Sequence, residues 1–132
     1  MAHVFISYAH KDDNAFFNEL KRHLAISEID FWTDEHIPPA EKWITEIESN
    51  LSQSFALIVI ASKNSIERNW VHFEWAYALG MKTKVIVIKI EEITLPDPLP
   101  FIQNISRPQS SSEWGQLIQV LRKQRNETWL RY

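Results

Sequence analysis

Residues 55–60 read Phe-Ala-Leu-Ile-Val-Ile, an unbroken apolar run with the length of one strand. A strand that alternates apolar and polar residues has one face in water. An unbroken apolar run has both faces covered, as in a parallel sheet. We therefore predict that residues 55–60 form the central strand of a parallel sheet.

Strands and helices are predicted to alternate on both sides of this run. Short apolar segments at residues 4–8, 29–32 and 84–90 predict further strands, and residues 101–102 predict a short edge strand. Between the strands, apolar residues recur at three- and four-residue spacing, as in helices that pack on a sheet. The pattern predicts an α/β, flavodoxin-like, three-layer α/β/α fold with a central, mostly parallel five-stranded sheet.

One helix is predicted over residues 70–79, with recognisable signals at both ends. Asn69 is a residue type that caps helix N-termini. Gly80 lacks a Cβ and suits a left-handed residue at the C-terminal end. We expect these two residues to bound the helix.

Composition narrows the function classes. The chain has 132 residues, of which 45% are hydrophobic, so we expect a single folded domain over residues 1–132. A formal charge of -3 gives no basic field for nucleic acid or anionic membrane, and no apolar run has the length of a membrane span. The chain has no Cys and no signal-peptide pattern at its start, so we expect a cytoplasmic protein without nucleic-acid or membrane partners.

Several enzyme classes of this architecture are excluded by the glycines. Gly80 and Gly115 are the only glycines, and neither follows a predicted strand. This excludes a dinucleotide-binding fingerprint, a P-loop and a Gly-x-Ser-x-Gly hydrolase elbow. The five His residues are scattered without a close ligand pair, so no metal site is predicted.

Ligands of open α/β sheets bind beyond the carboxyl ends of the strands, where the strand order reverses. That rule selects residues 7–11, 32–39 and 62–74. The segment that stands out begins with the last of these ranges. Residues 62–76 read Ser-Lys-Asn-Ser-Ile-Glu-Arg-Asn-Trp-Val-His-Phe-Glu-Trp-Ala.

This motif resembles the Toll/interleukin-1 receptor (TIR) domain, in which a Ser-rich loop leads into a helix with Trp and, four residues later, Glu. Trp70 and Glu74 fit that spacing. Residues 4–8 resemble the first TIR box, and residues 34–43 occupy the place of the family's BB loop. The resemblance runs through the chain in the right order, and the chain looks like the prokaryotic, NAD-cleaving type of TIR protein.

The resemblance implies that Glu74 is the catalytic residue of an NAD glycohydrolase. Such an enzyme cleaves the nicotinamide–ribose bond to give nicotinamide and ADP-ribose or a cyclic ADP-ribose isomer. It uses NAD as its substrate and needs no cofactor. Residues four apart share one helix face, so Trp70 lies beside Glu74 as a wall of the site or as a core anchor. An ordinary solvated carboxylate is the competing interpretation of Glu74.

Other residues are candidates for substrate binding because of their place at the strand ends or in the family's loops. Each also has a structural interpretation: Ser7 and Tyr8 as partners of nearby backbone, Asp34 as a loop cap, and Trp43 as a core residue. The complete substrate-binding set is Ser7, Tyr8, Asp34, Trp43, Ser62 and Trp70.

By family analogy, we expect a homo-oligomer that pairs through the 34–40 loop, completes its site between protomers and is switched on by a fused or separate sensor protein. Antiviral defence or cell-death signalling is the implied role. Two alternatives stay open. One is a non-enzymatic TIR adaptor that self-associates. The other is a nucleoside deoxyribosyltransferase-like enzyme, because residues 74–80, Glu-Trp-Ala-Tyr-Ala-Leu-Gly, are similar to that family's carboxylate helix.

Overall fold

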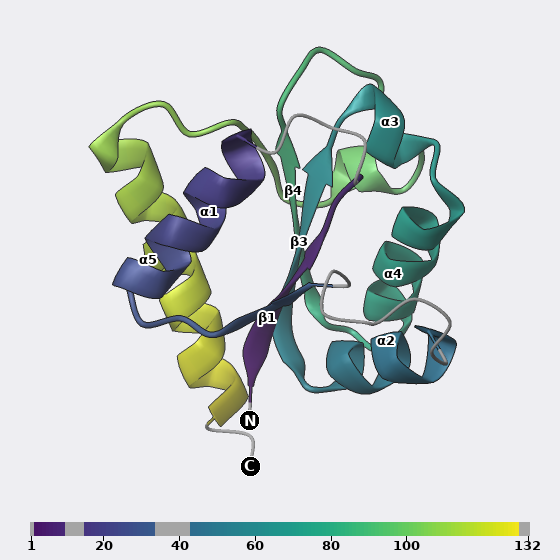
Figure 1. The fold of residues 1–132 in the computed structure, drawn as a ribbon, viewed down its shortest axis with the longest axis horizontal. Helices are drawn as coiled ribbons and strands as arrows, with labels where there is room; N and C mark the ends of the chain where they lie inside the picture. The colour runs from purple at the N-terminus through teal and green to yellow at the C-terminus, as the bar shows by residue number, and fades with distance from the viewer. Residues whose placement is uncertain (1, 10–14, 34–42, 130–132) are drawn as a thin grey trace.

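A computed structural model describes residues 2–9, 15–33 and 43–129 (Figure 1). The strands are β1 (His3–Ser7), β2 (Phe31–Thr33), β3 (Ser54–Ala61), β4 (Lys84–Lys89) and β5 (Asn104–Ser106). The helices are α1 (Ala15–Ile26), α2 (Trp43–Ser52), α3 (Lys63–Ile66), α4 (Asn69–Gly80), a 3-10 helix (Leu99–Phe101) and α5 (Ser111–Trp129).

The five strands form one sheet in the order β2-β1-β3-β4-β5, and every neighbouring pair is parallel. The predicted fold class is therefore confirmed, with β3 as its central strand. The chain moves from β1 outward to β2 and then returns to place β3 on the other side of β1. The strand order thus reverses between β1 and β3, and all strands end at the same edge of the sheet.

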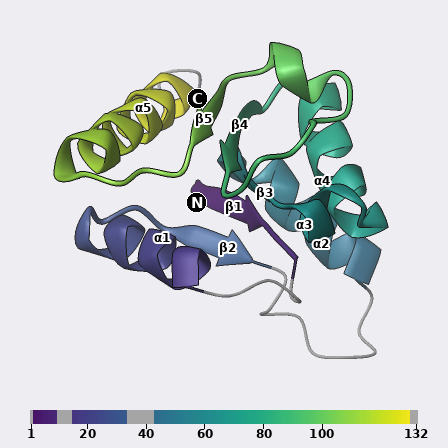
Figure 2. The same cartoon turned by 90° about the horizontal axis from the view of Figure 1, so that it is seen from above.

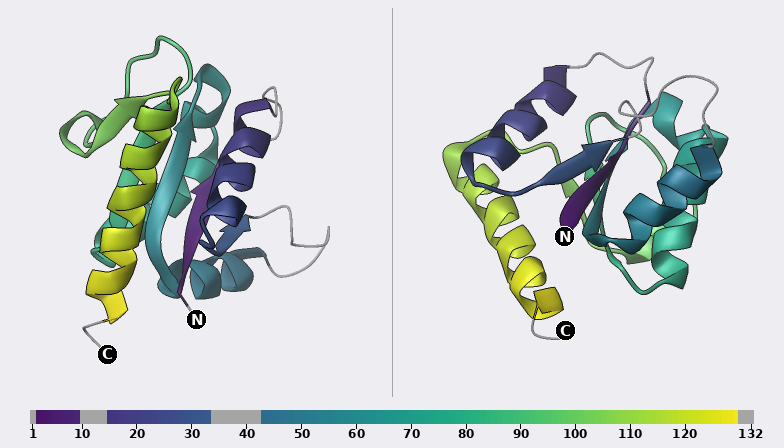
Figure 3. Two further views of the ribbon diagram at one scale, coloured as in Figure 1. Left: turned by 90° about the vertical axis from the view of Figure 1, so that its left-hand side faces the viewer. Right: turned by 60° about the horizontal axis from the view of Figure 1, so that its bottom comes forward.

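Helices cover both faces of the sheet. In the view from above, α1 and α5 lie on one side, and α2, α3 and α4 lie on the other (Figure 2). The longest helix, α5, runs along the sheet (Figure 3) and packs on β3. Successive side chains of a strand point to opposite faces, so each strand contributes to two separate apolar layers.

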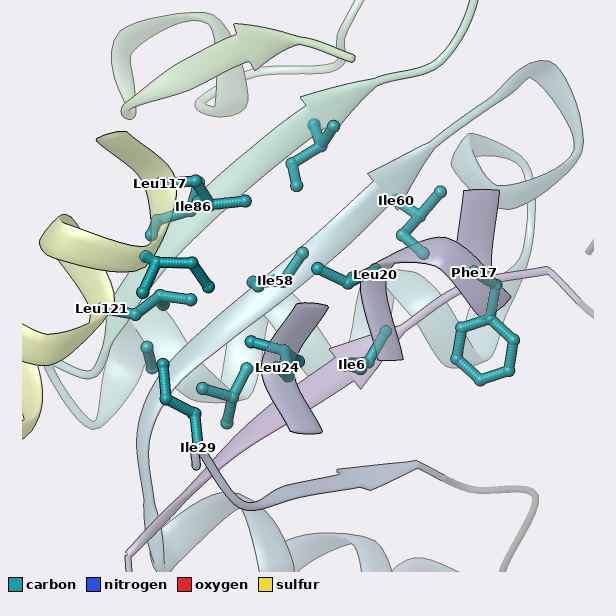
Figure 4. Packing of buried hydrophobic residues seen from close by; sticks show 14 of the residues in the cluster. Ile6, Phe17, Leu20, Leu24, Ile29, Ile58, Ile60, Ile86, Leu117 and Leu121 are labelled. Atoms are coloured by element: carbon teal, nitrogen blue, oxygen red, sulfur yellow. The ribbon is translucent and has the colours of Figure 1, made fainter. Parts of the chain in front are cut away.

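The first layer joins the sheet to α1 and α5. Ile6, Ile58 and Ile86 come from neighbouring strands and belong to one buried cluster with Leu20 of α1 and Leu121 of α5 (Figure 4). Ile58 is fully buried, and a buried side chain of this kind stabilises the fold by about 1.5–3 kcal/mol. This layer holds the scaffold together on the face away from α4.

The second layer joins the sheet to α2 and α4. Phe5, Leu57 and Val87 are the strand residues that alternate with those of the first layer, and they pack with Val71 and Trp75 of α4. Odd-numbered residues of β1 therefore face α4. This assignment decides on which side of the sheet the candidate site residues lie.

The ends of α4 and the position of the last strand differ from the predictions. The helix of residues 70–79 includes Asn69, follows Arg68 without a side-chain cap, and continues through Gly80. The left-handed backbone after it belongs to Lys82 (φ 62°), while Gly80 keeps a negative φ. Residues 101–102 are not a strand: Phe101 ends the 3-10 helix, and the edge strand β5 begins at Asn104.

Each edge strand has three described residues, Phe31–Thr33 in β2 and Asn104–Ser106 in β5. The short β5 edge offers few unpaired backbone groups to another chain. Among the residues that the structure describes, none of the helices has the length and apolar character needed to cross a bilayer.

His23 links α1 to α5 by ring stacking. Its imidazole lies on the indole of Trp114, with the ring centroids 3.9 Å apart and the planes 10° from parallel. The pKa of His23 is lowered from 6.5 by burial and by the nearby Arg22 cation, partly offset by Glu19. The folded state therefore favours the neutral imidazole.

We expect the stability of the protein to fall in mild acid because of His23. A lowered pKa means that the unfolded chain binds the proton more tightly than the folded chain. The contribution is complete above about pH 6.5 and is lost as the pH falls through the lower pKa of the folded state. Urea unfolding at pH 7.5 and pH 5 gives the loss in the free energy of unfolding between the two pH values. This loss should be smaller in His23→Phe than in the parent, because Phe keeps the ring stack and does not titrate. Equal losses in both proteins would contradict this account.

Candidate active site

Glu74 lies in the buried face of α4. The buried residues of this helix are Val71, Glu74, Trp75 and Ala78, which follow helical spacing and face the sheet. Glu74 is 1% exposed, so a carboxylate occupies the middle of an otherwise apolar stripe. A charged group in such a place is costly unless it is hydrogen-bonded. The solvated-carboxylate interpretation is therefore wrong.

Ser7 supplies a hydrogen bond to this carboxylate. Its Oγ donates to Oε1 of Glu74 at 2.5 Å, across 67 positions of the sequence. Ser7 is itself 1% exposed, and as an odd-numbered residue of β1 it points toward the α4 layer. The bond has the length typical of a hydroxyl donating to a carboxylate, which is among the stronger hydrogen bonds in proteins.

The pair lies at the place that the fold rule selects. Ser7 is the last residue of β1 and pairs with Val59 of β3, so it lies at the carboxyl edge between the two strands where the order reverses. Glu74 reaches the same point from α4. Strand order, strand parity and helix phase thus bring one hydroxyl and one carboxylate together at the expected ligand position.

Tyr8 follows Ser7 in sequence but lies on the other side of the sheet. It belongs to the α1 and α5 layer, where its ring stacks on Phe17 with a centroid distance of 4.0 Å. It is 7% exposed. The structure thus brings Ser7 to Glu74 and does not bring Tyr8 there.

Aromatic side chains of α4 surround the buried stripe. Trp70 is half-buried, packs against the α2 and α4 layer, and meets Phe73 edge-on with a centroid distance of 5.9 Å. Tyr77, one turn after Phe73, is half-buried as well and contacts that ring. Trp70 therefore lies one turn before Glu74, partly open to solvent.

Ser62 serves the backbone. Its Oγ accepts the backbone N–H of Ser65 at 3.0 Å, and the Oγ of Ser65 accepts the backbone N–H of Ser62 at 2.8 Å. This reciprocal capping box begins α3 directly after β3. The Ser65 hydroxyl also donates to the carbonyl of Ile60 at 2.8 Å, which fixes the turn onto the end of the central strand.

The structure does not describe the side chains of two other candidates, Asp34 and Trp43. Asp34 and the 34–40 loop fall outside the described residues. Trp43 is the first residue of α2, and its side chain is likewise outside the description.

A surface hollow of about 460 Å³ lies beside α3 and the segment that follows β4. Its lining contains none of the predicted site residues and consists of Lys63, Ile66, Glu67, Glu92, Ile93 and Thr94. The described residues contain no group of three or more His, Cys, Asp or Glu side chains placed to hold a metal ion.

Sequence reasoning treated Ser7 and Tyr8 alike and missed that Ser7 and Glu74 are partners. The missing signal was strand parity. Phe5 and Ser7 share one face of β1, and the topology places α4 over that face. Alternation along the strand could therefore have assigned Ser7 to the side of Glu74 and Tyr8 to the side of α1.

These features define a parallel α/β domain with a buried carboxylate at its topological switch point. The family model described as the TIR domain matches residues 4–128. The chain therefore belongs to the TIR domain family. No curated protein matches it.

Solved structures of TIR domains share the fold. The TIR domain of the Toll-related receptor TRR-2 from Hydra magnipapillata superposes with a TM-score of 0.76 at 19% identity, covering 90% of this chain and 97% of that one. A TIR-STING receptor from C. gigas in complex with 2',3'-cGAMP gives 0.73 at 19% identity, covering 90% of this chain and 39% of that one. The TIR domains of the activated Roq1 resistosome give 0.59 at 21% identity, covering 67% and 57%.

We expect Ser62→Ala to destabilise the fold, because it removes one half of the capping box. The loss should be about 1 kcal/mol of the free energy of unfolding, and Ser62→Thr should retain most of it, since Thr also caps. Urea denaturation of the three proteins measures this. An unchanged stability together with weaker substrate binding would instead make the hydroxyl a substrate contact.

Proposed function

We propose that this TIR domain is an NAD glycohydrolase that cleaves the nicotinamide–ribose bond and releases nicotinamide with ADP-ribose or a cyclic ADP-ribose isomer. The observation that supports this is the buried carboxylate of Glu74 in the apolar stripe of α4. An apolar residue there would cost the fold less, so a function accounts for the carboxylate better than stability does. The TIR family includes NAD-cleaving enzymes, and the Trp70 to Glu74 spacing matches theirs.

The chemistry needs little more than one held carboxylate. As the bond breaks, its electron pair goes to the positively charged nicotinamide ring, which leaves neutral without a general acid. Positive charge develops on the ribose, as in glycoside cleavage. Glu74 stabilises that charge, and a fixed group in a water-poor site contributes about 3–4 kcal/mol of barrier lowering. Water, or a nucleophilic atom of the same molecule in the cyclising case, then bonds to the ribose carbon and loses its proton.

Substrate binding extends from Glu74 along the carboxyl edge. Trp70 walls the nicotinamide side by apolar contact and excludes water. Asp34 and Trp43 are proposed to contact the rest of the dinucleotide from the 34–40 loop and the start of α2. NAD is the substrate in this scheme, and no cofactor takes part.

Nicotinamide release by concentrated protein, identified by mass spectrometry, tests the proposal. Glu74→Gln keeps the side-chain shape and the acceptor for Ser7 but removes the charge, so turnover should fall on the order of 10²-fold or more. Glu127→Gln, which neutralises an exposed carboxylate on α5, is the matched control and should cleave like the parent.

Three results would contradict the proposal. Folded Glu74→Gln that cleaves NAD as fast as the parent removes Glu74 from catalysis. A parent that self-associates but never cleaves NAD is an adaptor. A covalent adduct with a 2-fluoro-deoxynucleoside, detected by intact mass, identifies a deoxyribosyltransferase-like enzyme.

The proposed activity depends on self-association through the 34–40 loop, as expected for a domain switched on by a fused or separate sensor in antiviral defence or cell-death signalling. Ile44 supports this placement. It lies in the first turn of α2, four positions after residue 40 in the sequence, and 54% of its surface is exposed. Covering an exposed isoleucine with a partner removes apolar surface from water, which stabilises the complex.

Ile44→Asp should therefore weaken assembly. At one fixed concentration its specific activity should fall about tenfold and recover as the protein is concentrated, in step with light scattering. Ile26→Asp is the matched control, because Ile26 is 69% exposed but ends α1 on the opposite face of the sheet. Equal effects of both variants, or activity independent of concentration, would contradict this interface.

A further inference from the structure

Ser7 and Glu74 form a buried, hydrogen-bonded pair, and the proposed reaction assigns a role only to the glutamate. A glutamate side chain has several rotatable bonds, and its carboxylate acts on a developing charge only when it is held in one place. The Ser7 hydroxyl engages one of the two carboxylate oxygens at 2.5 Å. The direction of the other oxygen is fixed at the same time, because the carboxylate is planar.

We propose that Ser7 is a positioning residue for Glu74 and not a substrate contact. This inference rests on the proposed function. The Ser7 hydroxyl has one proton and donates it to Oε1 of Glu74, so no proton is left for it to donate to a ligand. Ser7 holds the carboxylate in the orientation in which it stabilises the ribose cation.

The backbone around Ser7 makes it a rigid support. Ser7 ends β1 and is in register with Val59 in the central strand, while Phe5, two residues earlier on the same face, is fully buried in the α2 and α4 layer. A group on a paired strand is held more accurately than one on a loop. The serine therefore transmits the position of the sheet to a residue on a helix.

Steady-state kinetics separates positioning from substrate contact. In Ser7→Ala we expect kcat to fall on the order of 10²-fold with KM nearly unchanged, because only the orientation of the carboxylate is lost. Ser7→Thr keeps the hydroxyl and should regain at least about tenfold of that loss. Ser54→Ala is the matched control: it removes a serine hydrogen bond to the Asn50 carbonyl at the amino end of β3 and should leave both constants unchanged.

Three kinetic results would overturn the proposal. A higher KM with unchanged kcat in Ser7→Ala would make Ser7 a substrate contact. Unchanged kcat and KM would make the bond purely structural. A loss in Ser7→Thr as deep as that in Ser7→Ala would show that packing, and not the hydroxyl, is responsible.

Proton NMR of the wild-type protein tests the pair without any turnover. A buried hydroxyl that donates to a carboxylate should give a downfield proton signal in slow exchange with water. In folded Glu74→Gln the signal should move upfield, since the acceptor loses its charge. A Ser7 hydroxyl proton that exchanges rapidly, or that ignores Glu74→Gln, overturns the proposal even if Ser7→Ala does not fold. An intact signal with no nicotinamide release by the wild type would instead reject the proposed function.

Discussion

The burial of one carboxylate is the constraint on which this edge of the molecule depends. Glu74 lies in the helix face that packs on the sheet, and the polar partner for it comes from β1, 67 residues earlier. A slip of one residue in β1 would turn Ser7 to the opposite layer and leave an apolar side chain beside the carboxylate. The alternation of Phe5, Ile6 and Ser7 is therefore a requirement of the site as well as of the core.

Most of the fold could be predicted from the sequence, because a strand that is buried on both faces consists of an unbroken run of apolar residues. The run at residues 55–60 predicted the central strand, and the parallel order around it follows from alternating strands and helices. The edges were not predictable in the same way. The three residues of β5 are partly exposed and carry no apolar run, so a propensity argument placed that strand on Phe101 and Ile102, where a proline-rich segment forms a 3-10 helix.

The candidate site was predictable in part. Family resemblance and the switch-point rule selected Glu74, but neither indicated its burial, because composition alone favours an exposed glutamate. Ser62 was predicted as a substrate-binding residue because it follows the central strand. In the structure it caps α3 together with Ser65, and that role can be recognised only when both serines are considered as a reciprocal pair. Tyr8 was grouped with Ser7 by sequence adjacency, although adjacent residues of a strand point apart.

The brevity of β5 limits how one copy of the domain can pair with another at that edge of the sheet. Three residues offer too little hydrogen-bonding backbone for another strand to extend the sheet there. The self-association proposed above therefore has to rely on contacts between side chains at this edge, and such contacts form and dissociate as the concentration changes. Assembly of that kind is reversible, whereas continuous cross-strand growth would be close to irreversible.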